Sequence, residues 1–200
     1  MTMLTGMETL KRITGLLLSG VLLLTTGCTT LVENVNEDPI RMNPRERTWG
    51  SWLDDQTIET VAAVNINKAD PGYNRSSRVK VVSFNGIVLL VGQVPDERLK
   101  NLAGETAKKV NQVRQVYNEL TVEEYASLVT QSNDSWLTTK IKTGLISNDQ
   151  VTADRIKINT EKGTVYLMGM VTPKEAQIAV EVARGTRGVQ KVVKVFEYIP

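Results

Sequence analysis

The sequence contains one segment twice, and this internal repeat constrains the fold more than any other feature. Residues 79–92 align without a gap on residues 156–169. In both copies, two runs rich in β-branched residues flank a short turn, Asn85-Gly86 in the first and Lys162-Gly163 in the second. Asn-Gly strongly favours a type I′ hairpin because both central residues need positive φ, and Lys-Gly is its weaker counterpart. The repeat therefore predicts two copies of one small domain.

Each hairpin is followed by a predicted helix and a final strand. Thr172 is a suitable N-cap residue, with Pro173 at the first helical position and Glu175 in capping-box spacing. Alanines allow each helix to lie close to a sheet, and they recur at Ala103 and Ala107 and at Ala179 and Ala183. The final strands are expected over residues 113–122 and 189–198, where apolar and polar residues alternate.

A further helix precedes each hairpin. The first is expected over about residues 57–67 after the capping candidates Asp54 and Asp55, and the second over about 136–147 after Asn133-Asp134-Ser135. We therefore predict an α+β fold of two tandem α-β-β-α-β units, each with two helices packed on a small mixed three-stranded sheet. The predicted ranges are 54–122 for the first domain, 123–132 for a connector and 133–200 for the second domain.

Composition argues against most kinds of catalysis. The 200-residue chain has no histidine and one cysteine, which excludes Ser-His-Asp and Cys-His nucleophile systems, imidazole–zinc sites and an internal disulfide. The paired carboxylates Asp54/Asp55 and Glu123/Glu124 lie where helix caps or linkers are expected. A net charge of +2 is too small for a protein whose partner is nucleic acid. We expect a protein that is not an enzyme, with no catalytic residues, no metal and no cofactor.

The N-terminus has the pattern of an export signal. The apolar run Ile13–Leu24 follows two basic residues and is too short to span a bilayer, which needs about 20 helical residues. The segment resembles the signal of bacterial lipoproteins, although Thr25 replaces the usual leucine three residues before Cys28. We expect residues 1–27 to be a lipoprotein signal peptide, Cys28 to be acylated and residues 28–53 to form a polar tether. An ordinary secretory signal with an incidental cysteine is the alternative.

Two further motifs resemble the BON domain of bacterial envelope proteins. They are Asn-Gly-x-Val-x-Leu-x-Gly-x-Val at residues 85–94 and Val-x-x-Val-x-Asn-x-Leu-x-Val at residues 113–122; the second repeat departs from them with Lys162 and Lys194. A lipoprotein signal before two such domains is similar to the dual BON-domain outer-membrane lipoproteins. The resemblance implies a non-enzymatic, lipid-anchored protein that faces the periplasm. It also implies binding of anionic phospholipid through the second domain and a role in envelope integrity, including at the division site.

The residues themselves point to a lipid-binding face on the helix predicted from 136 to 147. Leu137, Ile141 and Leu145 form its core stripe, whereas a neighbouring stripe joins an indole, an ammonium and two hydroxyls, on Trp136, Lys140, Thr143 and Ser147. An indole beside an ammonium suits the headgroup level of a membrane. The net charge of +3 over residues 133–200 adds weak attraction to an anionic surface. The alternative is that Trp136 packs on the first domain or on a strand edge.

Further expectations concern the first repeat and the partners of the protein. In the first repeat we expect Ile58 at the place of Trp136, and we expect Trp49 and Trp52 to pack back on the first domain. The alternative function is a protein-interaction scaffold for envelope assembly machinery, with incidental lipid contact. The sequence does not fix the oligomeric state.

Overall fold

The structure, a computed structural model, describes residues 48–123 and 128–200, which belong to one compact unit. We call residues 48–123 the first repeat and residues 128–200 the second repeat. The predicted signal peptide, the acylation site Cys28 and the tether up to residue 47 lie outside the described residues. Within the described ranges, no helix combines the length and apolar character needed to cross a membrane.

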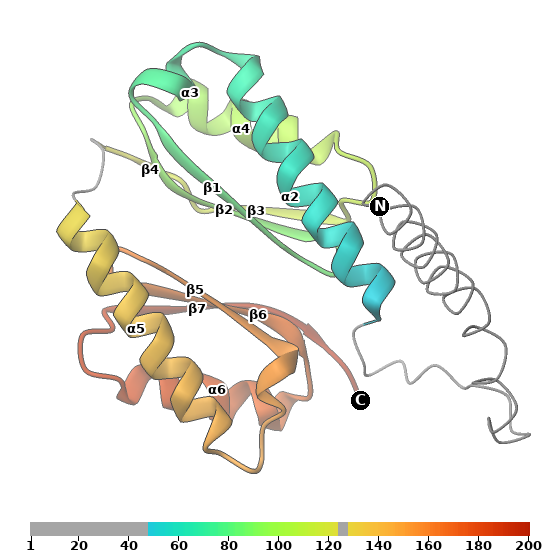
Figure 1. Ribbon diagram of the computed structural model, residues 1–200, viewed down its shortest axis with the longest axis vertical. Helices are drawn as coiled ribbons and strands as arrows, with labels where there is room; N and C mark the ends of the chain where they lie inside the picture. The colour runs from blue at the N-terminus through green and yellow to red at the C-terminus, as the bar shows by residue number, and fades with distance from the viewer. Residues whose placement is uncertain (1–47, 124–127) are drawn as a thin grey trace, which may run out of the picture. The chain divides into compact units, whose positions relative to one another are not determined.

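The first repeat is a small mixed sheet covered by helices. Its elements in chain order are α2 (Trp49–Ala69), α3 (Gly72–Arg75), β1 (Arg78–Phe84), β2 (Ile87–Val94), α4 (Glu97–Lys108), β3 (Gln115–Asn118) and β4 (Thr121–Val122). The central strand β2 pairs antiparallel with β1 and parallel with both β3 and β4. Helices α2 and α4 cover the same face of this sheet (Figure 1).

The second repeat has the same order of main elements, but a 3₁₀ turn stands where the first repeat has α3, and its last strand is unbroken. In the first repeat the strand predicted over residues 113–122 is divided into β3 and β4, so that sheet has four strands and not the predicted three. The elements of the second repeat are α5 (Leu128–Ile146), the 3₁₀ turn η1 (Ala153–Arg155), β5 (Ile156–Glu161), β6 (Thr164–Val171), α6 (Pro173–Gly185) and β7 (Lys191–Tyr198). Strand β6 pairs antiparallel with β5 and parallel with β7, and α5 and α6 cover one face (Figure 1). The predicted α+β class with two small mixed sheets is confirmed.

Local sequence explains the turns and the start of α6. Asn85 and Gly86 have φ of 51° and 73°, and Lys162 and Gly163 have φ of 48° and 73°, as the type I′ prediction requires. At the start of α6, Thr172 accepts from the backbone N–H of Glu175 while the Glu175 side chain accepts from the backbone of Thr172. The predicted capping box is therefore present.

The two preceding helices begin earlier than the sequence predicted. Helix α2 begins at Trp49, where the Oγ1 of the N-cap residue Thr48 accepts from the backbone N–H of Ser51 at 3.1 Å. Helix α5 begins at Leu128. Residues 49–53, assigned to the tether, and 128–132, assigned to the connector, are therefore helical. The capping roles predicted for Asp54, Asp55 and Asn133-Asp134-Ser135 are wrong, because these residues lie inside the helices.

Each repeat has its own core beneath its helices. The side chains that α2 and α5 turn toward their sheets are at most 1% exposed: Ile58, Ala62 and Ile66, and Leu137, Ile141 and Leu145. All of them except Leu137 belong to core clusters that also contain the buried alanines of α4 and α6 and residues of β2 and β6. These cores fix which stripe of each helix faces solvent.

A third apolar cluster joins the two repeats. It is built from strand residues of both repeats: Val82, Phe84, Ile87, Leu89, Val91, Tyr166, Met168 and Val195. Ion pairs flank it, with N–O distances of 2.6 Å for Arg78–Glu161, 2.6 Å for Lys157–Glu59 and 2.5 Å for Arg114–Glu197. Because strand residues of the two repeats bury one another here, the helices and the free strand edges are the surfaces open to ligands.

Candidate functional site

The outer face of α5 carries the residues that the sequence singled out. Trp136 is 53% exposed, and Lys140, Thr143 and Ser147 are also exposed. The first three lie on α5, and Ser147 directly follows its last residue. The helix is held from its opposite side by a fully buried leucine and isoleucine stripe. The structure therefore brings the four residues to one face and leaves it open.

The indole of Trp136 and the ammonium of Lys140 contact each other on this face. The Lys140 Nζ lies 4.8 Å from the centroid of the Trp136 ring, which is within cation–π range. Thr143 and Ser147 donate their hydroxyl protons to the carbonyls of Thr139 and Thr143, both at 3.0 Å, so their oxygens remain available as acceptors. Trp136 is not sealed against a strand edge or the first repeat, which was the alternative prediction.

Two neighbours refine the boundary of this face. Ile146, the last residue of α5, is 64% exposed and adds apolar surface that the sequence analysis did not single out. Its position beside the predicted core stripe, and not in it, is the sequence signal that could have predicted its exposure. Lys142 points elsewhere, because its Nζ donates to the carbonyl of Ala153 at 2.6 Å.

A buried aspartate near the middle of α5 fixes this helix to its hairpin. Asp134 is 5% exposed, and its two carboxylate oxygens accept from the backbone N–H groups of Lys162 at 2.7 Å and Gly163 at 2.8 Å. These N–H groups belong to the β5–β6 turn. Asp134 therefore fixes the position of α5 at a point two residues before Trp136.

The first repeat has the same clamp, and it corrects the correspondence between the repeats. The carboxylate of Asp55 accepts from the backbone N–H groups of Asn85 at 2.8 Å and Gly86 at 3.0 Å, as Asp134 does in its own turn. When Asp55 is aligned with Asp134, Ile58 corresponds to Leu137, and both are core residues. The prediction that Ile58 takes the place of Trp136 is therefore wrong, because Thr57 occupies it.

The two remaining tryptophans are also more exposed than predicted. Trp49 is 84% exposed and Trp52 is 42% exposed, and their rings contact each other edge to face at 6.1 Å. The prediction that they pack back on the first domain is wrong, since both lie in the first turn of α2, beyond its buried residues.

One carboxylate of each pair considered for catalysis, Asp55 and Glu123, has structural partners, and Glu124 lies outside the described residues. Besides the clamp, Asp55 Oδ1 accepts from the Ser83 hydroxyl at 2.6 Å, and Glu123 lies 2.6 Å from the Nζ of Lys162. The hydrogen bond from Lys162 is the first cause of the lowered pKa of Glu123. In the part of the chain that the structure describes, no three Cys, Asp or Glu side chains gather to hold a metal ion.

The fold and the repeats define the class of protein. The sequence profile of the BON domain matches residues 54–124 and 133–200, so the chain belongs to the BON domain family. It is 38% identical over 183 residues to the outer membrane lipoprotein DolP of Haemophilus influenzae, covering 92% of this chain and 94% of that protein.

Two other known proteins are similar to this chain in sequence. The chain is 40% identical over 153 residues to a 21 kDa hemolysin of Actinobacillus pleuropneumoniae, covering 76% of this chain and 78% of that protein. It is 28% identical over 146 residues to the osmotically-inducible protein Y of Escherichia coli, covering 72% of each chain.

Proposed function

We propose that this protein is a non-enzymatic outer-membrane lipoprotein that binds anionic phospholipid through the exposed face of α5, formed by Trp136, Lys140, Thr143 and Ser147. The single observation that carries the proposal is the half-exposed indole of Trp136 with the Lys140 ammonium 4.8 Å from its ring. The name of the Haemophilus relative supports the outer-membrane location and the lipoprotein class.

The chemistry of the face fits the boundary between headgroups and acyl chains. An indole has an apolar body and one N–H donor, so it favours the depth where hydrocarbon meets water. The stem of Lys140 can lie along apolar surface while its ammonium meets a phosphate. The hydroxyls of Thr143 and Ser147 extend the polar side of the contact toward the headgroups.

The energies imply weak binding that needs a second anchor. Burying about 100 Å² of indole surface contributes about 2.5 kcal/mol, and one lysine near an anionic surface about 1 kcal/mol. A total of about 3.5 kcal/mol corresponds to millimolar affinity. Acyl chains on Cys28 would hold the protein at the membrane and raise the local concentration, so that a weak face is sufficient.

The test uses the mature chain with Cys28→Ser, which cannot be acylated, so that only the protein surface contributes. The chain has three tryptophans, and Trp49→Phe with Trp52→Phe leaves Trp136 as the one reporter. We expect its emission to shift to the blue on titration with phosphatidylglycerol vesicles and to stay unchanged with phosphatidylcholine vesicles.

Sedimentation with the same vesicles measures the partition coefficient for each variant. Trp136→Ala is expected to lower it about seventyfold and Lys140→Ala about fivefold, from the energies above. Lys109→Ala is the matched control, since it removes an exposed lysine from the first repeat. Unchanged sedimentation of Trp136→Ala would show that α5 is not the lipid site and would favour a protein-interaction scaffold.

We extend the proposal to the cell. A lipid-anchored protein with a weak second contact to anionic phospholipid would concentrate where such lipids are enriched, and this is the basis we propose for a role in envelope integrity and at the division site. Loss of Trp136 should then disperse a fluorescent fusion over the envelope while leaving its amount unchanged. A retained division-site signal in that variant would argue for recruitment by protein partners.

A further inference from the structure

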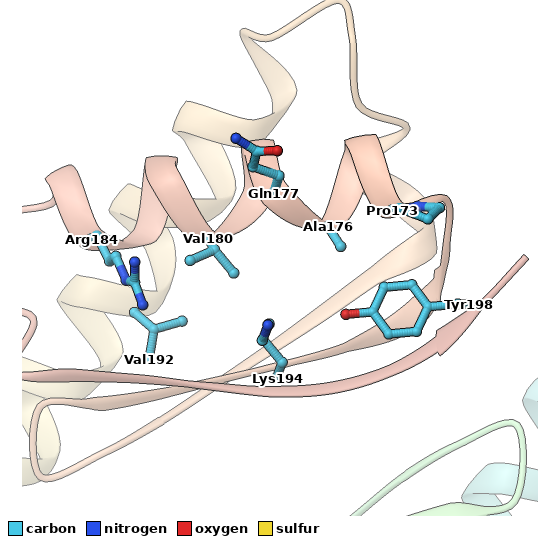
Figure 2. A pocket seen from close by; sticks show the side chains of 8 residues that line it. All are labelled: Pro173, Ala176, Gln177, Val180, Arg184, Val192, Lys194 and Tyr198. Carbon is cyan, nitrogen blue, oxygen red and sulfur yellow. The ribbon is translucent and has the colours of Figure 1, made fainter.

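The second repeat has another surface with basic and apolar side chains, and the proposed lipid-binding face does not include it. An open groove of about 510 Å³ lies between α6 and β7. Figure 2 shows its two walls, with side chains of α6 facing side chains of β7. The residues that matter here are Ala176, Val180 and Arg184 on α6, and Val192, Lys194 and Tyr198 on β7.

The groove combines buried apolar side chains with exposed basic ones. Ala176 and Val180 are buried, whereas Arg184 and Lys194 are exposed on opposite walls. Within the described ranges, neither cation has a hydrogen-bonded or ion-paired partner. The nearby carboxylate of Glu181 accepts from Gln177 at 3.1 Å, and that of Glu197 pairs with Arg114. The groove is therefore complementary to a ligand with both apolar groups and carboxylates.

One wall of the groove is also an edge of the sheet. In the order β5-β6-β7, β7 pairs with β6 along all eight residues and lies at the end of the sheet. The outer edge of such a strand presents unpaired backbone N–H and C=O groups. An extended peptide can pair with them while every second side chain enters the groove beside the strand.

The first repeat closes the same place. Asn118, the counterpart of Lys194, donates from Nδ2 to the carbonyl of Lys100 at 2.7 Å, and its side chain fills the space over Gly104. Its Oδ1 accepts from the backbone N–H of Leu120, and the strand is interrupted there, between β3 and β4. The groove and the unbroken edge are therefore specific to the second repeat and are not a consequence of the fold alone.

We propose that this groove binds an extended acidic peptide segment of another protein, which pairs with β7 as an added strand. Its carboxylates meet Lys194 and Arg184, and its apolar side chains lie on Ala176 and Val180. A second copy of this chain fits poorly, because Lys191 and Lys194 along each β7 edge would repel each other. The site is separate from the α5 face, so the inference does not rest on the proposed lipid binding.

The test uses the mature Cys28→Ser chain and an eight-residue blocked peptide, Glu-Thr-Val-Thr-Glu-Thr-Val-Thr, which places Glu and Val at alternate positions on one side. Titration followed by ¹H–¹⁵N NMR should shift the amides of β7 and α6 and leave those of α5 unchanged. The same peptide with Lys in place of Glu should not bind. N-methylation of alternate peptide bonds, on the edge that meets β7, should abolish binding.

Variants assign the effect to the groove. Lys194→Glu and Arg184→Glu should each weaken binding of the acidic peptide at least tenfold. Lys191→Glu is the matched control, because it makes the same charge change on the same strand at a residue that does not line the groove, and its effect should stay below threefold. Equal losses for Lys191→Glu and Lys194→Glu would refute the groove and leave only a general charge effect.

Two other outcomes would also overturn the proposal. If phosphatidylglycerol vesicles shift the NMR amide signals of β7, including that of Lys194, and the peptide does not, the groove is a lipid site. If both peptides bind with equal affinity, charge does not select the ligand. Neither result would bear on the α5 face, whose test depends on Trp136.

Discussion

Replacing Asp134 by alanine is expected to destabilise the second repeat strongly. Its carboxylate accepts from two backbone N–H groups of the β5–β6 turn, at 2.7 Å and 2.8 Å, and the residue is 5% exposed. Alanine would leave the N–H groups of Lys162 and Gly163 without their acceptor in a largely buried place.

The magnitude follows from the two bonds that are lost. A hydrogen bond to a charged acceptor contributes about 1.5–3 kcal/mol, so the pair is worth about 3–6 kcal/mol. A domain of this size has a total free energy of unfolding of about 5–15 kcal/mol. The variant should therefore lose a large share of its stability. Because the clamp positions α5, vesicle binding should also fall although Trp136 and Lys140 are unchanged.

Urea unfolding followed by circular dichroism measures this loss directly. The midpoint should fall while the dependence of the unfolding free energy on urea stays the same. Asp149→Ala is the matched control, because Asp149 is exposed, and its effect should stay within about 0.5 kcal/mol. A loss of less than 1 kcal/mol for Asp134→Ala would refute the clamp.

Three further predictions concern the backbone and the ion pairs. Gly169→Ala should lower the free energy of unfolding in urea by about 3 kcal/mol or more, because the new methyl would lie 2.2 Å from the carbonyl oxygen of Arg155. Gly185→Ala is the control, because a methyl at Gly185 would have no atom within 4 Å. Gln112→Gly should stabilise by about 0.5 kcal/mol in the same assay, because Gln112 has a φ of 68° where the second repeat has Gly188, and a loss of stability would refute this. The hydrogen bond from Arg114 lowers the pKa of Glu197 below its ordinary 4.5, so the contribution of this carboxylate is complete above pH 4.5 and is lost as the pH falls through the lowered pKa. Arg114→Ala should flatten the stability profile below pH 4.5, and an unchanged acid slope would contradict the assignment.

The strands, turns and the start of α6 could be predicted because their signals are local. Asn85-Gly86 and the capping box at Thr172 each act within four residues, and the structure shows both. The sequence does not predict the starts of α2 and α5, because Asp55 and Asp134 accept from distant turns and do not cap these helices. Asp55 contacts a turn 30 residues away, and only the fold brings these groups together.

The candidate site was predictable in part for the same reason. The spacing of Trp136 and Lys140 depends on helical periodicity, and their shared exposed face follows once the buried stripe is known. The exposure of Trp49 could not be read from the sequence, since it depends on where α2 begins relative to its sheet. The groove beside β7 was also hidden, because a lysine in place of an asparagine changes little in a strand pattern.

The two repeats differ on surfaces that their shared fold leaves exposed. Strand residues from both repeats form the shared apolar cluster, and separating the repeats would expose these residues to water. The outward helix faces and free edges lie outside this cluster. There the first repeat has Thr57 and Asn118, which are small or bonded to their own domain, whereas the second has Trp136 and Lys194, whose functional groups face solvent. Replacing both second-repeat residues with their first-repeat counterparts should then remove vesicle binding and peptide binding together while stability changes by less than 1 kcal/mol, because neither residue supports a core.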